Sequence, residues 1–178
     1  MVDEPEEIRW AGKFITARTR GKWEYVTRAR GIRAAVILAI DAEDHVILVE
    51  QFRVPLQKRC LELPAGLIGD DQGAEGEDAL AAAVRELEEE TGYHAERIES
   101  LGEFYSSPGM VSESFTLVRA HGLTRVGPGG GTDGEDITVH RVALAHLPQF
   151  VEMARARGLG IDVRVLMLLA PALLGGTK

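Results

Sequence analysis

Four glutamates lie within five residues near the middle of the chain, in the stretch RELEEETGY that runs from Arg85 to Tyr93. On a helix with about 3.6 residues per turn, Glu86, Glu89 and Glu90 share one face, whereas Glu88 points elsewhere. Like charges three or four residues apart repel by roughly 0.2–0.5 kcal/mol per pair, a penalty that a bound cation would remove. Mg²⁺ prefers oxygen ligands, commonly a few carboxylates together with substrate phosphates. The pattern therefore indicates either a divalent-metal site or a solvated acidic helix face.

The residues around these glutamates predict the helix that must position them. The expected core stripe consists of Leu80, Val84 and Leu87. Gly92 stands where a left-handed residue would end the helix. Arg85 is placed to pair with Glu88 or Glu89 and so to offset part of their repulsion. Three small residues near the glutamate face are expected to leave room for a ligand or loop: Ala79, Ala82 and Ala83.

Runs of β-branched, aromatic and aliphatic residues on both sides of this helix predict strands. They cover residues 22–29, 33–40, 45–52, 60–68, 97–105, 112–123 and 137–144. Two further helices are expected, one at 147–157 and one at about 161–174. A Gly/Asp-rich loop precedes the acidic helix, and the glycine cluster 127–131 lies in a second loop. The order of elements predicts a mixed α/β fold.

Composition restricts the class of protein. A chain of 178 residues, 45% hydrophobic, suits one globular domain. A formal net charge of -8 argues against non-specific nucleic-acid binding, which depends on Lys and Arg. Cys60 is the only cysteine, so we expect a reducing compartment. The acidic N-terminus is unlike a secretory signal, and the longest apolar stretch falls short of the roughly 18 residues of a membrane span. We therefore expect a cytoplasmic protein without membrane contact.

The acidic helix also carries a recognisable motif. Its matching positions are Glu77, Arg85, Glu86, Leu87, Glu89, Glu90, Gly92 and Tyr93. They resemble the later part of the Nudix box, G-x5-E-x7-R-E-U-x-E-E-x-G-U, in which U is apolar. The opening glycine of the box corresponds to Gly66, but ten residues separate it from Glu77 where the pattern has five. We interpret the excess as a loop insertion that leaves the helix intact.

Other segments resemble the ADP-ribose and ADP-sugar pyrophosphatase branch of the Nudix hydrolases. These are VEQFR, LELPAGL, SPG at Pro108 and GEDITVH at 134–140. The resemblance implies an α/β/α sandwich around a mixed sheet, formed by residues 33–178. It also implies a small N-terminal β segment, residues 1–32, that supplies dimer contacts and adenine binding.

The resemblance further implies a set of metal ligands and catalytic groups. Mg²⁺, or Mn²⁺ in its place, would be held by Glu86, Glu89, Glu90, Glu135 and the backbone carbonyl of Ala65. The general base of this branch comes from the late acidic loop, which offers Asp133 or Glu135. Glu89 and Arg85 complete the implied catalytic set.

The same resemblance suggests which residues hold the substrate. Trp23 would stack on adenine, with Glu24 at the base edge and Phe14 reaching across a dimer. Arg28 and Arg53 would hold phosphate oxygens, and Glu113 would face the terminal ribose. Each residue also has an ordinary structural explanation, as a packed aromatic side chain or a solvated charge.

The function implied is Mg²⁺-dependent hydrolysis of ADP-ribose, or of a related ADP-sugar, to AMP and a sugar phosphate by a homodimer. One alternative is a Nudix hydrolase of another nucleoside diphosphate derivative or of a dinucleotide. A second is a sensor that binds an ADP-ribose-type ligand without hydrolysing it. A third is an interaction module whose acidic helix is decorative.

Overall fold

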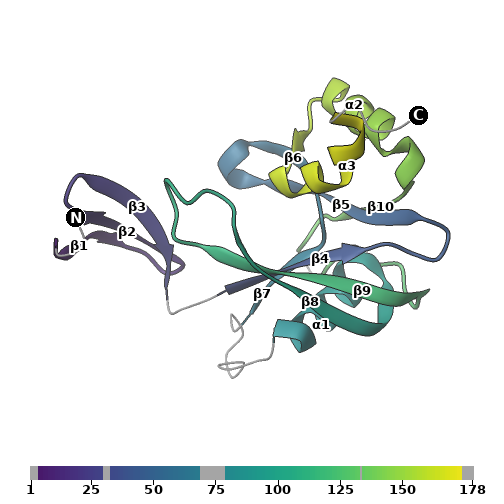
Figure 1. The fold of residues 1–178 in the computed structure, drawn as a ribbon, viewed down its shortest axis with the longest axis horizontal. Coiled ribbons are helices and arrows are strands. Elements are labelled where there is room, and N and C mark those ends of the chain that lie inside the picture. The colour runs from purple at the N-terminus through teal and green to yellow at the C-terminus, as the bar shows by residue number, and fades with distance from the viewer. Residues whose placement is uncertain (1–3, 30–32, 69–78, 133, 174–178) are drawn as a thin grey trace.

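The computed structural model describes residues 4–29, 33–68, 79–132 and 134–173. Its N-terminal part is a three-stranded antiparallel sheet that projects to one side of the molecule in Figure 1, made of β1 (Glu6–Ala11), β2 (Ile15–Arg20) and β3 (Trp23–Arg28). Val26 joins this sheet to the body, because its amide donates to Met110 O and its carbonyl accepts from Ser112 N, each at 3.0 Å. The predicted N-terminal β segment is therefore present. Its predicted boundary falls at residues 30–32, outside the described ranges.

The body contains two four-stranded sheets, ordered β10-β5-β6-β11 and β7-β4-β9-β8. The strands are β4 (Arg33–Ala39), β5 (His45–Arg53), β6 (Lys58–Glu62), β7 (Ala65–Ile68), β8 (Tyr93–Tyr105), β9 (Ser114–Arg125), β10 (Thr138–Ala143) and β11 (Gly160–Ile161). β4 is parallel to β9 and β11 to β6, whereas the other pairs in the body are antiparallel. Helix α1 (Ala79–Thr91) lies on one side, and α2 (Leu147–Ala156) and α3 (Leu166–Leu173) lie on the other (Figure 1). The predicted α/β/α sandwich around a mixed sheet is confirmed.

Two apolar clusters hold these layers together, and alternation along the strands assigns residues to one or the other. In β4, Ile37 belongs to the cluster under α1, whereas its neighbour Val36 belongs to the cluster under α2 and α3. Ile47 and Leu48 in β5 divide in the same way. All four side chains are fully buried. These strands therefore read as continuous apolar runs because both of their faces are covered.

The acidic helix α1 carries the four clustered glutamates and ends where the sequence predicts. Gly92 adopts φ 71°, and its amide donates to Glu88 O at 2.9 Å, which confirms it as the helix terminator. The space expected beside Ala82 and Ala83 is absent, because both are fully buried in the core with Leu87. Small side chains at these positions allow α1 to lie close to the sheet, so the prediction of a ligand space there was wrong. Leu80 and Val84, expected in the core stripe, are only half-buried.

The C-terminal region departs from the single helix expected at 161–174. Gly160 and Ile161 instead pair with Cys60 and Leu61 as an added parallel strand. A 3-10 turn, Val163–Val165, then leads into α3, and its cap is the Asp162 side chain, which accepts from Arg164 N at 2.8 Å. Two further 3-10 turns of the same length span Val54–Leu56 and Leu144–His146. In the described residues, no helix combines the length and apolarity needed to cross a bilayer.

Candidate active site

The glutamate face of α1 borders a pocket of about 400 Å³ against β7. Its lining consists of Gln51, Arg53, Ala65, Gly66, Leu67, Arg85, Glu86, Glu89, Glu90, Thr132 and Glu135. We call this space the acidic pocket. The structure thus brings together all five residues that the sequence assigned to metal binding, including Glu135 from a distant loop.

Glu90 is the most buried carboxylate of this pocket, with 5% of the residue exposed. Its Oε2 accepts a hydrogen bond from Ala65 N at 3.0 Å. Burial raises the pKa of Glu90 to about 8, and the charges of Glu86 and Glu135 add to that rise, against the opposing effects of the Ala65 amide and Arg53. The pocket therefore concentrates negative charge that its own cations do not balance.

The pKa of Glu86 is also raised, and the position of its side chain accounts for the glycine that opens the motif. Burial, and then the charges of Glu89 and Glu135, raise the pKa of Glu86, although Arg85 acts in the opposite direction. A side chain at Gly66 would collide with the side chain of Glu86. Gly66 therefore leaves room for that carboxylate over β7. The longer spacing between Gly66 and Glu77 preserves this contact, although Glu77 itself lies outside the described residues.

Arg85 holds two of the glutamates in place. Its Nη1 lies 3.0 Å from Glu89 Oε2 and its Nη2 lies 3.0 Å from Glu86 Oε1. The prediction that Arg85 reaches Glu88 or Glu89 is confirmed for Glu89. Glu88 instead pairs with His94, outside the pocket.

Glu135 reaches the acidic pocket through the glycine cluster. Gly130 N donates to Glu90 O at 2.9 Å and Gly131 N donates to Glu89 O at 3.0 Å, so the loop is fastened to the C-terminal carbonyls of α1. Gly129 has φ 69°, and a side chain there would meet the backbone of Thr91 and Glu90. Sequence reasoning missed this role of the glycines. Asp133, the other candidate base, lies outside the described residues.

A second pocket of about 720 Å³ adjoins the first along β7, and both share Arg53 and Ala65 to Leu67. We call it the cationic pocket, because its lining includes Arg28, Arg53, Lys58 and Arg164. Arg53 makes a bidentate pair with buried Glu62 at 2.7 and 2.6 Å, and Arg28 donates to Glu113 at 2.6 Å. The structure therefore brings together Arg28, Arg53 and Glu113, as the sequence predicted.

Sequence reasoning missed one wall of the cationic pocket. Arg164 donates to both oxygens of Asp162, at 2.6 and 2.7 Å, and lies over the ring of Phe115, with 5.6 Å between its Cζ and the centroid. The preceding strand β11 places this pair at the pocket. The sequence carries no local signal for it, because the pairing of β11 with β6 joins segments that are about a hundred residues apart.

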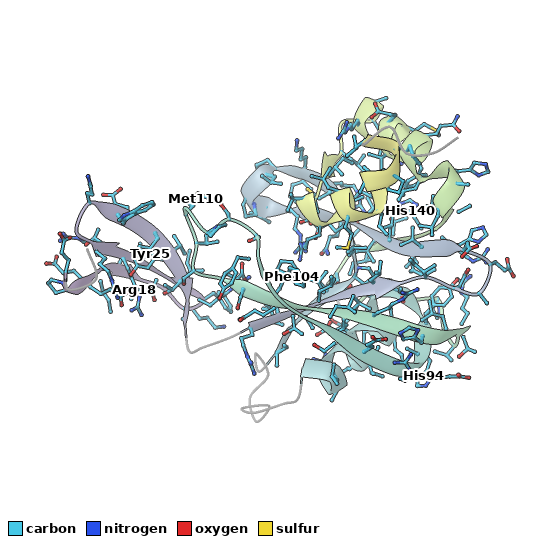
Figure 2. The ribbon with its side chains drawn as sticks, viewed as in Figure 1. Arg18, Tyr25, His94, Phe104, Met110 and His140 are labelled. Carbon is cyan, nitrogen blue, oxygen red and sulfur yellow. The ribbon has the colours of Figure 1, made fainter. Side chains whose placement is uncertain are left out.

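Three expected substrate residues line neither of these pockets. Trp23 and Phe14, on the N-terminal sheet and its first turn, are 58% and 45% exposed. Glu24 borders a separate hollow of about 340 Å³, whose lining includes Arg18, Tyr25 and Met110. Figure 2 labels these three side chains. Within one chain the structure does not bring these residues to the acidic pocket or the cationic pocket. Their substrate roles stay predictions.

The donors around the acidic pocket suit a hard divalent cation, because they are carboxylates and a backbone carbonyl rather than thiolates or imidazoles. Within residues 4–29, 33–68, 79–132 and 134–173, no group of three or more acidic, histidine or cysteine side chains is arranged so that these side chains alone could hold a metal ion. Phosphate oxygens and waters would complete the coordination, as Mg²⁺ usually requires.

The α/β/α sandwich places a helix that bears carboxylates, the ligands that Mg²⁺ prefers, beside a pocket lined by arginines, whose guanidinium groups suit phosphate oxygens. The sequence matches the NUDIX domain over residues 30–157, so the chain belongs to the Nudix family. The predicted family is thereby confirmed. Members of this family in general use a divalent metal.

Two relatives and one solved structure show what the chain is similar to. The chain is 37% identical over 123 residues to the methanol dehydrogenase activator of Bacillus methanolicus, covering 68% of this chain and 64% of the relative. It is 42% identical over 91 residues to the ADP-ribose pyrophosphatase of Bacillus subtilis (strain 168), covering 51% and 46%. The chain thus spans less than two thirds of either relative. A crystal structure of an ADP compounds hydrolase matches with TM-score 0.68 and 26% identity, over 96% of this chain and 92% of that one.

Proposed function

We propose that the protein hydrolyses the diphosphate bond of ADP-ribose, or of a related ADP-sugar, to AMP and a sugar phosphate in a Mg²⁺-dependent reaction. The observation that carries the proposal is the contact between the acidic and cationic pockets along β7, with Arg53 lining both. A diphosphate at this boundary would place its oxygens between arginines and the glutamates that hold the cation. The ADP-ribose pyrophosphatase and ADP compounds hydrolase among the similar proteins support this choice of substrate.

The residues of the two pockets would have different roles in this reaction. When bound, the divalent cation would neutralise phosphate charge and lower the pKa of water. Glu86, Glu89, Glu90 and the Ala65 carbonyl would hold it, and Arg85 would keep Glu86 and Glu89 oriented. Arg53 and Arg28 would bind phosphate oxygens, and Glu113 would face the terminal ribose.

Glu135 is our choice of general base. Its Oε2 accepts from Thr132 N at 2.9 Å, and its charge raises the pKa of both Glu86 and Glu90, so it faces the same space. From there Glu135 would take the proton of the attacking water. A role for Glu135 as a further metal ligand is the alternative at the same position.

The adenine end of the substrate requires a second copy of the chain in this proposal. Large apolar side chains of the N-terminal sheet and its first turn are exposed, among them Ile8 at 60%, Trp10 at 56% and Trp23 at 58%. Exposed apolar patches of this kind are typical of protein interfaces. A homodimer would cover them and carry Trp23, Glu24 and Phe14 toward adenine. The cytoplasmic location stays a prediction.

The test is mass-spectrometric product analysis with Mg²⁺ and a panel of ADP-ribose, ADP-glucose, NADH, a diadenosine polyphosphate and a nucleoside triphosphate. AMP and ribose 5-phosphate from ADP-ribose support the proposal. Consumption of another compound in its place would keep the metal site and overturn the substrate. Binding of ADP-ribose without turnover, with either Mg²⁺ or Mn²⁺, would favour the sensor.

A further inference from the structure

The loop that carries Glu135 is held by hydrogen bonds both before and after this residue in the sequence. Before Glu135, Gly130 and Gly131 donate to the carbonyls of Glu90 and Glu89, as described above. After it, the segment from Asp136 to Thr138 is held by Arg59 of strand β6, which is separated from β10 by β5 in the sheet. The two fastenings come from different elements and together enclose the proposed base.

Arg59 makes three hydrogen bonds to this segment. Its Nη1 donates to Asp136 Oδ2 at 2.6 Å, and its Nη2 donates to Asp136 O at 3.1 Å and to Thr138 Oγ1 at 3.2 Å. The guanidinium is itself oriented by Glu50, because Nε donates to Glu50 Oε1 at 2.8 Å and Nη2 donates to the Glu50 carbonyl at 2.8 Å. A planar guanidinium fixed in this way sets the direction as well as the distance of its contacts.

Arg59 pairs with the buried carboxylate of Glu50, but Glu50 does not depend on Arg59 alone. The Glu50 side chain is only 4% exposed, but it has two other partners: His140 at 3.0 Å, labelled in Figure 2, and Arg157 at 3.1 Å. The contacts that depend on Arg59 are those to Asp136 and Thr138. The Asp136 side chain is 85% exposed, so its ion pair with Arg59 contributes little to folding.

We propose that Arg59 and Asp136 form a clamp that positions Glu135 in the acidic pocket. Glu135 directly precedes Asp136, so a shift of the clamped backbone moves the carboxylate away from the acidic pocket. Arg59 and Asp136 touch neither pocket and act through Glu135 as positioning residues. The inference rests on the proposed function, because it requires Glu135 to act in the reaction.

The test compares Asp136→Ala and Arg59→Lys with the native protein in steady-state hydrolysis of ADP-ribose. A misplacement of about 1 Å can cost on the order of a hundredfold in rate, so we expect kcat to fall roughly ten- to hundredfold with KM unchanged. Asp136→Asn, which keeps an oxygen that accepts from Arg59, should recover most of the lost kcat. The matched control is Glu43→Ala, because the Glu43 side chain, in the turn before β5, is 74% exposed and pairs at 2.7 Å with Arg141 of β10. This control should keep native kcat.

A double-mutant cycle separates positioning from general destabilisation. In a Glu135→Gln background, Asp136→Ala should cause no further loss, because the group it positions is gone. Native kcat in Asp136→Ala and Arg59→Lys, or an equal loss with and without Glu135, would overturn the clamp while the proposed function stands. A native protein that binds ADP-ribose but releases no AMP would overturn the proposed function, and the clamp with it.

Discussion

The stability of the metal-free protein should depend on pH through Glu90, and Glu90→Gln should remove that dependence. Glu90 has a pKa of about 8 in the folded protein against 4.5 as the ordinary value. A carboxyl whose pKa is raised by folding stabilises the fold when it is protonated. Its contribution is complete below pH 4.5 and is lost as the pH rises through 8.

The magnitude follows from the shift. Each pKa unit corresponds to about 1.4 kcal/mol, so the whole loss is about 5 kcal/mol above the folded pKa. Between pH 6 and pH 8 the native protein should lose about 2 kcal/mol of unfolding free energy relative to Glu90→Gln. Saturating Mg²⁺ should restore it, because a bound cation compensates the ionised carboxylate.

The assay is urea unfolding in EDTA at several pH values, for the native protein, for Glu90→Gln and for Glu96→Gln as a control at an exposed carboxylate. The native and Glu96→Gln curves should fall together with rising pH, whereas the Glu90→Gln curve should be flatter. If the native and Glu90→Gln curves ran parallel from pH 6 to pH 8, the argument from the burial of Glu90 would be refuted.

Three further predictions concern the loop, the cationic pocket and the adenine end. Gly129→Ala should lower the unfolding free energy by about 1–3 kcal/mol and also lower kcat, because φ is positive at Gly129 and the backbone of α1 occupies the place of the new side chain. Gly158→Ala, at a similar φ but in open space, should leave kcat native. Thermal melting and kinetics check both variants, and native kcat in Gly129→Ala would count against the role of the loop. Arg53→Met should cost about 3–5 kcal/mol in denaturant unfolding, because Glu62 is left buried without its bidentate partner; a loss below about 1 kcal/mol would show that the pair is not a structural requirement. Trp23→Ala should raise KM for ADP-ribose with kcat unchanged in the dimer, and an unchanged KM would remove Trp23 from the substrate site.

The centre of the fold was readable from the sequence because its signals are local. Residues 34–40 and 46–49 are continuous apolar runs, and they lie in or directly after β4 and in β5, strands that are covered on both faces. The acidic helix ends at Gly92 as expected, and its glutamates meet β7 at the acidic pocket. Spacing along one helix was enough to group Glu86, Glu89 and Glu90.

The parts that escaped prediction depend on contacts between distant segments. Strand β1 is exposed along its whole length and β2 has one buried residue, Thr16, so neither shows the apolar alternation that identifies a half-buried strand. The pairing of Gly160 and Ile161 with β6 is set by tertiary packing, and the sequence pattern favoured a helix there. The Asp162–Arg164 pair at the cationic pocket and the Arg59 clamp were missed for the same reason, because no local sequence pattern indicates either of them.

The measurement that tests the central claim most directly is AMP release from ADP-ribose as a function of Mg²⁺ concentration, for the native protein, Glu90→Gln and Glu88→Gln. Glu88 lies on the same helix but outside the acidic pocket, and its side chain is 41% exposed. The account predicts saturable Mg²⁺ dependence for the native protein and Glu88→Gln, and no turnover for Glu90→Gln at any Mg²⁺ concentration. Equal activity of the two variants, or native turnover in EDTA, would contradict it.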